Sequence, residues 1–255
     1  VKLMKKIRAV GLIPTRLGSQ RLPQKALLDI NNLPLIIHTY RRAKLSKLLD
    51  DVIICCDDKK ILKVAKHFNA KAILTSSNHT NGTERICEGY HKLKKKYDLV
   101  VDIQGDEPLI SPLHIDSVIK FHSKNLDFGI ILPTLKTKSL TNQNIVKVIT
   151  NLKNEVLYLS RAQIPFEFKG KNNYLKKHLS IISFKPEILK KFSLHKKTPL
   201  EKIEDVELLR ALEIGIKIKT TNLNGDSFSI DIMEDYLKAK KQILNDKFLK
   251  LYYEN

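Results

Sequence analysis

The segment IRAVGLIPTRLGSQRLPQK, residues 7–25, sets an apolar run directly before a basic loop. Residues 7–13 predict a buried β-strand, because a short apolar run is typical of a strand covered on both faces. The loop gathers cations and a hydroxyl within ten positions: Arg16, Ser19, Arg21 and Lys25. Ligands of open α/β sheets bind beyond the carboxyl ends of the strands, so this loop is a candidate triphosphate site. Its spacing fits neither a Walker A loop nor a GxGxxG turn, and a lone loop of this kind is also typical of an exposed basic surface.

Outward from this segment, short apolar runs alternate with helical patterns up to about residue 125. The predicted strands are residues 52–56, 71–74 and 98–103, and the predicted helices are residues 34–48, 60–68, 83–96 and 112–123. This alternation predicts an α/β fold with a mainly parallel, doubly wound sheet.

After residue 126 the pattern changes to strands with few helices, which predicts a smaller mixed or antiparallel lobe. Its predicted strands are residues 130–134, 146–150, 156–160, 178–184 and 217–221, and its one long helix is residues 199–214. A strand at residues 227–231 and a helix from Glu234 onward return to the core. The predicted domains are therefore residues 1–125 plus 222–255 for the nucleotide-binding core, and 126–221 for the lobe.

Composition restricts the classes of function. The chain has 46 Lys and Arg against 27 Asp and Glu, a formal net charge of +19, but the lysines are scattered and only 7% of residues are aromatic. Neither a binding stripe nor a base-stacking platform is indicated, so we expect no nucleic-acid partner. Cys55, Cys56 and Cys87 lack metal-ligand spacing. No apolar run matches a membrane span or a signal peptide, so we expect a cytoplasmic protein without a membrane partner.

Two further segments place carboxylates after predicted strands. DIQGDEP, residues 102–108, contains Asp106, and Asp231 ends the strand predicted at residues 227–231. Mg²⁺ takes few protein carboxylates alongside phosphate oxygens and water, so Asp106 is a candidate ligand. NGTER, residues 81–85, predicts a helix start with Thr83 as its cap and amides that favour an anion. Each segment alone is also typical of a plain turn or cap.

Taken together, seven segments resemble the 3-deoxy-manno-octulosonate cytidylyltransferases, also called CMP-Kdo synthetases. They occur in that family's order: PTRLGSQRLPQK, NGTERI, DIQGDEPLI, LSRAQIPF, KHLSII, TPLEKIEDVELLRALEIGIKI and SIDIMEDY. The resemblance implies a nucleotide-diphospho-sugar transferase-like fold, CTP and an acidic sugar as substrates, and Mg²⁺ as cofactor. It also implies a homodimer built through the second lobe and a role in lipopolysaccharide biosynthesis.

The resemblance also implies roles for individual residues. Pro14, Arg16, Ser19, Lys25, Arg85 and Gln104 match nucleotide-binding positions, and Gln104, Arg161, His178 and Glu207 match sugar-binding positions. Asp106 and Asp231 match the metal-binding pair, and Lys25, Arg16 and Asp106 match the catalytic set. From the residues alone, His178 is typical of a core histidine and Glu207 of a solvated helix face.

Departures from the family's pattern include Ile182 in place of a tyrosine and Leu208 in place of a glutamine. We expect both to lie in the sugar pocket, where the loss of polar groups changes discrimination. One alternative is therefore the activation of another ulosonic acid, an 8-amino or a nonulosonic sugar. A second is a nucleotide- or nucleic-acid-binding module without catalysis. The intact set of Arg16, Lys25, Asp106 and Asp231 argues against it.

Overall fold

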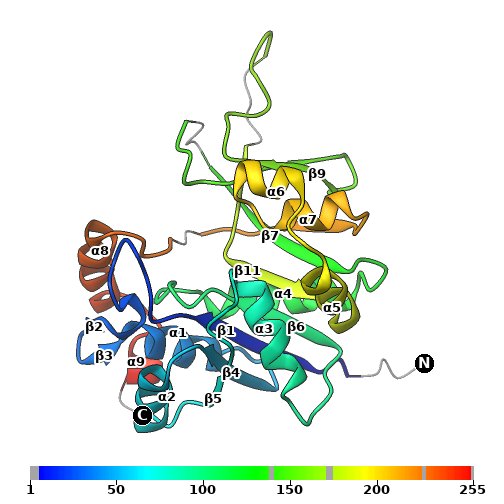
Figure 1. The fold of residues 1–255 in the computed structure, drawn as a ribbon. Helices are drawn as coiled ribbons and strands as arrows, with labels where there is room; N and C mark the ends of the chain where they lie inside the picture. The colour runs from blue at the N-terminus through cyan, green and yellow to red at the C-terminus, as the bar shows by residue number, and fades with distance from the viewer. Residues whose placement is uncertain (1–5, 138–140, 171–174, 226–227, 254–255) are drawn as a thin grey trace.

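The computed structural model describes residues 6–137, 141–170, 175–225 and 228–253 (Figure 1), and a ten-stranded sheet runs through them. Four neighbouring strands of this sheet are parallel, in the order β5-β4-β1-β6. Their bounds are Ala72–Leu74, Asp51–Cys56, Ala9–Thr15 and Leu99–Ile103. Each is followed along the chain by a helix, so the predicted mainly parallel, doubly wound sheet is confirmed.

The helices that connect these strands begin where local chemistry predicts. They are α1 (Leu35–Lys44), α2 (Lys59–His67), α3 (Gly82–His91) and α4 (Pro112–Ser123). The Asp58 carboxylate caps α2 by accepting from the Lys60 amide. Asn81 caps α3 by accepting from the Glu84 amide at 2.8 Å, so the prediction that Thr83 is the cap is wrong. The Asn side chain two residues upstream accepts from a free amide of the first turn instead.

The second half of the chain continues the same sheet with mixed strand directions. Its strands are β7 (Ile130–Lys136), β8 (Lys147–Thr150), β9 (Val156–Ser160), β10 (Lys176–His178), β11 (Ile181–Phe184) and β12 (Ile218–Asn222). β11 lies antiparallel between β6 and β7, whereas β12 pairs parallel with β7. The strand order then ends in β10-β8-β9. The division into two domains stays a prediction, because the sheet is continuous across the proposed boundary.

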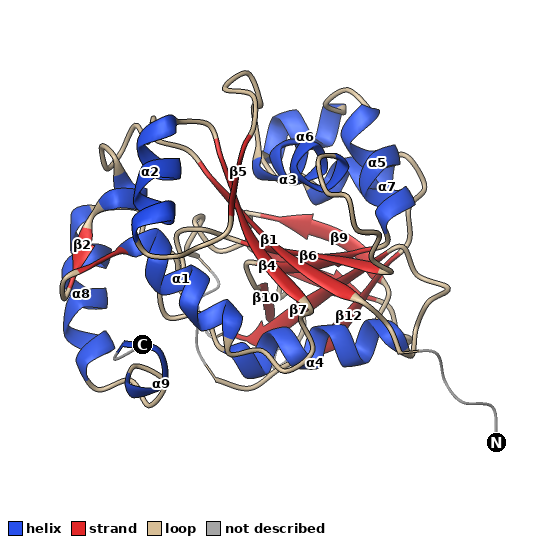
Figure 2. Cartoon of the chain, turned by 90° about the horizontal axis from the view of Figure 1, so that it is seen from below, coloured by secondary structure: helices blue, strands red, loops and turns tan. Residues whose placement is uncertain are grey.

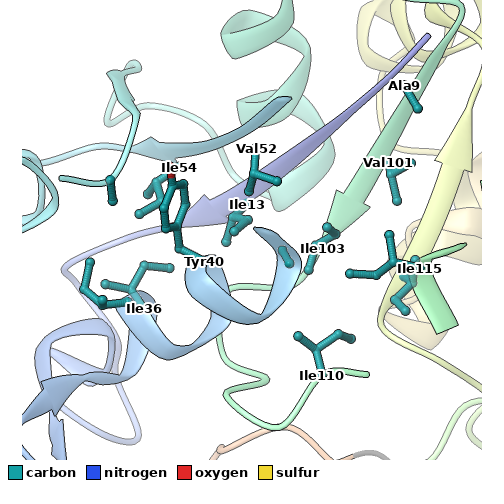
Figure 3. Packing of buried hydrophobic residues seen from close by; sticks show 14 of the residues in the cluster. Ala9, Ile13, Ile36, Tyr40, Val52, Ile54, Val101, Ile103, Ile110 and Ile115 are labelled. Carbon is teal, nitrogen blue, oxygen red and sulfur yellow. The ribbon is translucent and has the colours of Figure 1, made fainter. Parts of the chain in front are cut away.

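Helices cover both faces of the sheet, and each face has its own apolar cluster (Figure 2). One cluster packs α1, α2 and α4 against the strands; Figure 3 shows Ile36 and Tyr40 of α1 beneath Ile13, Val52 and Ile54. The other packs α3, α5 (Pro186–Leu194) and α7 (Leu208–Glu213) against the opposite face. A third, smaller cluster joins α8 (Met233–Leu244) to the short β2–β3 hairpin (Asp29–Ile30 and Leu33–Pro34). The described chain ends in α9 (Lys250–Tyr253).

Three predicted elements are wrong. The strand predicted at residues 178–184 is two strands, β10 and β11, with Leu179 and Ser180 between them. The helix predicted at residues 199–214 is two short helices, α6 (Pro199–Glu204) and α7, separated at Asp205, whose φ of 50° is left-handed. The apolar period continues through this break, so periodicity alone does not reveal it. The strand predicted at residues 227–231 does not form among residues 228–231, and residue 227 lies outside the described residues. That segment instead crosses Asp106, whose carbonyl accepts from the Ile230 amide.

Candidate active site

A cleft of about 840 Å³ opens at the carboxyl ends of β1 and β6. Pro14 ends the buried part of β1 at its floor, and Gly105 follows β6 beside it. A Cβ on Gly105 would lie 2.7 Å from the Pro14 carbonyl oxygen, so only glycine lets the two strand ends approach this closely. The floor is therefore formed by backbone, as expected at the edge of a parallel sheet.

The basic loop forms one wall of the cleft and meets both candidate metal carboxylates. Lys25 Nζ lies 2.7 Å from Asp106 Oδ2 and 3.5 Å from Asp231 Oδ1. It also donates to the Ile230 carbonyl oxygen at 2.7 Å. Arg21 Nη2 donates to the same Asp231 oxygen at 2.8 Å. Segments about 80 and 205 residues apart along the chain thus converge on a single ammonium group.

The oxygen atoms around the Lys25 ammonium are ligands that suit a magnesium ion. Two carboxylates and one backbone carbonyl surround a point that a cation, the Lys25 ammonium, already occupies. Mg²⁺ prefers such oxygen ligands and fills its remaining positions with phosphate and water. Among the described residues no group of three or more His, Cys, Asp and Glu side chains is placed to hold a metal. The Asp106 and Asp231 carboxylates are the side chains that could hold such an ion here.

The opposite wall comes from the second half of the chain and is held by Arg161 and Lys147. The Arg161 guanidinium donates to three backbone carbonyls at 2.8–3.1 Å, those of Gln143, Glu204 and Asp205. Lys147, fully buried, donates to the carbonyls of Asn142 and Arg161 at 2.7 Å each. Burial lowers the pKa of Lys147, and the neighbouring Arg161 charge acts in the same direction. Arg161 therefore holds the segments of this wall together as well as lining the cleft, and three of its five N–H donors are used for that purpose.

Two carboxyl groups at the cleft have raised pKa values: Asp102, which does not line it, and Glu207, which does. Burial raises the pKa of Asp102 well above its ordinary range, and the charges of Glu207 and Asp106 add to the shift. Asp102 Oδ2 accepts from the Gln104 amide at 3.0 Å, while its Oδ1 has no hydrogen-bond partner in the described part of the chain. Burial also raises the pKa of Glu207, although the Thr83 hydroxyl donates to it at 2.6 Å. Asp102 orients the Gln104 amide, and Thr83 orients Glu207, toward the same cleft.

All but one of the residues expected at the site lie in this cleft. Those lining it are Pro14, Arg16, Ser19, Lys25, Arg85, Gln104, Asp106, Arg161, Glu207 and Asp231. His178, in β10, is not among the lining residues and is half-buried, and its sugar-binding role stays a prediction. Arg85 is buried and donates to the Thr75 hydroxyl and the Ser76 carbonyl, so it supports the cleft wall from behind.

The expectation that Ile182 and Leu208 alter the sugar pocket is wrong. Ile182 is 7% exposed and Leu208 2% exposed, and both pack into the apolar cluster that includes α3 and α5. Neither lines the cleft. These two replacements therefore fill the core and give no reason to assign a different sugar.

Several cleft residues carried no sequence signal. They are Gln20, His79, Gln143, Asn144, Lys197 and Asp205. Each lies in a loop or at a helix break, where no periodic pattern marks an inward-facing side chain. Thr83 was singled out only as a helix cap. Its hydrogen bond to Glu207 spans 124 residues of sequence and is visible only in the folded chain.

A strand-end cleft with a cationic loop, a carboxylate pair and a second polar wall defines a nucleotidyltransferase with an α/β fold. Comparison with known proteins agrees. A cytidylyltransferase family model matches residues 10–218. The chain is 43% identical to the 3-deoxy-manno-octulosonate cytidylyltransferase of Thermodesulfovibrio yellowstonii, over 91% of this chain and 96% of that protein. It is 36% identical to the 8-amino-3,8-dideoxy-manno-octulosonate cytidylyltransferase of Shewanella baltica, over 92% and 98% respectively.

Solved structures give the same answer. A CMP:2-keto-3-deoxy-manno-octonic acid synthetase complexed with CTP aligns with a TM-score of 0.89 and 29% identity, over 93% of this chain and 99% of that one. The 4-diphosphocytidyl-2C-methyl-D-erythritol synthase of Anaerococcus prevotii, at 15% identity and a TM-score of 0.65, shares the fold. The chain belongs to the 3-deoxy-manno-octulosonate cytidylyltransferase family, and the resemblance in its sequence motifs is confirmed.

Proposed function

We propose that this enzyme transfers CMP from CTP to the anomeric hydroxyl of 3-deoxy-manno-octulosonate or a closely similar sugar acid, releasing pyrophosphate. The observation that carries the proposal is the convergence of Lys25, Asp106 and Asp231 in one cleft whose far wall bears Arg161. Relatives with this named activity match almost the whole chain.

The reaction is an in-line displacement at the α-phosphorus. A bond forms between the sugar oxygen and phosphorus, the bond to the pyrophosphate oxygen breaks, and the hydroxyl proton leaves. Arg16, Ser19 and Lys25 line the cleft and would bind the triphosphate, and the two cations would stabilise the negative charge that grows on the leaving pyrophosphate. On the opposite wall, the remaining Arg161 donors and the Glu207 carboxyl would bind the sugar's carboxylate and hydroxyls.

Asp106 and Asp231 are the proposed ligands of Mg²⁺. A bound magnesium ion would neutralise phosphate charge and lower the pKa of the attacking hydroxyl. The role of the chain itself is to hold the two carboxylates on one side of the cleft. The hydrogen bond from the Ile230 N–H to the Asp106 carbonyl and the contacts of Lys25 do this.

We also propose that the enzyme is a homodimer that joins through β9 and the segment after it. β9 ends the strand order of the sheet, and Leu157, Phe166 and Phe168 are 59%, 79% and 81% exposed. An edge strand beside exposed aromatic side chains is suited to cover by a second copy. Sedimentation of the wild type and of a Phe166→Ser/Phe168→Ser variant tests this, and a wild-type monomer at micromolar concentration contradicts it.

Among the described residues, no helix combines the length and the apolar character needed to span a bilayer. We propose a cytoplasmic location and a role in supplying activated sugar for lipopolysaccharide. One plant relative, from Arabidopsis thaliana, is named as mitochondrial; it is 39% identical over 91% of this chain.

The test is a substrate panel with purified protein, Mg²⁺ and each nucleoside triphosphate in turn. The sugars are 3-deoxy-manno-octulosonate, its 8-amino analogue and a nonulosonic acid, and the readout is pyrophosphate release. We expect turnover with CTP and 3-deoxy-manno-octulosonate to exceed all other pairs. Exclusive turnover of the 8-amino sugar would contradict the sugar assignment, and no turnover with any pair would contradict the transfer itself.

A further inference from the structure

The two candidate metal carboxylates carry their own counter-ions. Lys25 lies between Asp106 and Asp231, and Arg21 pairs with Asp231 from the solvent side. The Lys25 side chain is 17% exposed and the Arg21 side chain 60% exposed. Two cations therefore balance two carboxylates, and the local charge of the pair is neutralised by the protein.

The position of Lys25 is fixed by the backbone around it. Gln24, directly before it, adopts a left-handed conformation with φ of 51°, and a 3-10 turn (Lys25–Leu27) follows. The ammonium completes its third contact on the Ile230 carbonyl oxygen. Two of the three oxygens that would face a metal ion thus already accept hydrogen bonds from Lys25. The third, Asp231 Oδ1, accepts one from Arg21 and forms an ion pair with Lys25 at 3.5 Å.

We propose that Lys25 and Arg21 act as exchangeable counter-ions that keep free divalent metal out of the Asp106–Asp231 pair until a triphosphate draws them away. This inference rests on the proposed function, because it concerns the same metal site. A divalent ion entering without nucleotide must displace the ammonium and meets the Arg21 charge beside it. Opposite charges at 2.7 Å in a partly buried site attract strongly, so this displacement opposes binding.

The triphosphate reverses this balance. Its oxygens offer Lys25 and Arg21 stronger charge-assisted partners than a shared carboxylate does. Once both cations turn to the phosphates, the two carboxylates have lost their counter-ions and bind a divalent ion readily. Metal and nucleotide then bind together, and the same two cations serve first the carboxylates and later the pyrophosphate.

Direct binding of Mn²⁺ without nucleotide, measured by electron paramagnetic resonance, tests the proposal. We expect Lys25→Met to lower the Kd for Mn²⁺ at least about tenfold relative to the wild type, and Arg21→Met to lower it by less because Arg21 is more exposed. Lys197→Met is the matched control, because Lys197 lines the same cleft and its loss removes the same charge. The double variant Lys25→Met/Asp106→Asn should lose the increase in Mn²⁺ affinity that Lys25→Met alone produces.

Three results would overturn the proposal. They are an unchanged Mn²⁺ affinity in Lys25→Met, an equal increase in Mn²⁺ affinity in Lys197→Met, or an increase that persists when Asp106→Asn is added to Lys25→Met. Thermal unfolding of each variant checks the fold, and Lys25→Gln carries the same comparison if Lys25→Met does not fold. Pyrophosphate release by the wild type judges the proposed function separately. A wild type that turns over CTP yet binds free Mn²⁺ as tightly as Lys25→Met contradicts only the counter-ion proposal. If the wild type does not turn over CTP but Lys25→Met still binds Mn²⁺ more tightly than the wild type, only the transfer activity is contradicted.

Discussion

Replacing Arg210 by methionine should strongly destabilise the protein, because it breaks a buried ion pair. The side chains of Arg210 and Glu201 are 0% and 3% exposed, and Arg210 Nε donates to Glu201 Oε2 at 2.7 Å while Nη2 bonds the other carboxylate oxygen. The guanidinium also donates to the His195 carbonyl at 2.9 Å and stacks over the Phe192 ring. The pair ties α6 to α7 across the break at Asp205, and so holds the cleft wall that carries Glu207.

The magnitude follows from the burial. Removing one partner leaves a charge inside the protein without compensation, which costs roughly 3–5 kcal/mol. For a chain of this size that lowers the melting temperature by about 6–20 °C. The double variant Arg210→Met/Glu201→Gln removes the stranded charge and should recover roughly half of the loss.

Urea unfolding of the wild type, both single variants and the double variant forms a complete thermodynamic cycle. The reasoning is refuted if Arg210→Met lies within about 1 kcal/mol of the wild type. It is also refuted if the double variant loses the sum of the two single losses, because that additivity means that the two groups do not interact.

Three further predictions concern the site and the pH dependence of stability. Asp106→Asn should lower kcat at least about a hundredfold, a loss of about 3 kcal/mol of transition-state stabilisation, and near wild-type turnover would remove this carboxylate from the mechanism. Gly105→Ala should weaken CTP binding, measured by calorimetry, because its Cβ would lie 2.7 Å from a backbone oxygen, while Gly18→Ala, with open space around it, serves as the control; equal affinities would contradict the close-packed floor. Burial lowers the pKa of His38 and of His122 from 6.5 to about 4, so the unfolded chain takes up their protons first as the pH falls. The contribution of these two histidines to the free energy of unfolding is therefore complete above about pH 6.5 and is lost as the pH falls toward 4. Each histidine lowers the free energy of unfolding by about 2 kcal/mol between pH 7 and pH 5. Urea midpoints at those two pH values measure the loss, and midpoints unchanged between them speak against neutral buried histidines.

The parallel half of the fold was readable because each of its elements carries a complete local signal. Strand β4 is a continuous apolar run, and α4 begins at Pro112 and ends at Ser123 as its sequence predicts. The candidate phosphate loop and QGD turn were likewise visible, since charged residues that directly follow apolar strands stand out in the sequence. Periodicity failed at Asp205, where one left-handed residue breaks a helix without interrupting its apolar pattern.

The roles of individual side chains were predicted less well. His178 matches a sugar-binding motif but is not among the residues that line the cleft, and its role stays a prediction. Ile182 and Leu208 read as pocket substitutions, yet both lie in the core. A motif match indicates roughly where a residue lies in the fold. Whether its side chain faces the cleft or the core depends on the strand register and on local breaks in the helices.

The sequence by itself determined the α/β alternation, the family and the chemical kinds of side chain at the site, because these depend on short-range patterns and on motif identity. Only the tertiary structure decided that one ammonium lies between two carboxylates, that Arg161 binds three backbone carbonyls, and that Thr83 holds Glu207. The physical reason is distance along the chain. These contacts join residues up to 206 positions apart, and only the packed sheet and the helices on its faces bring such residues within hydrogen-bond reach.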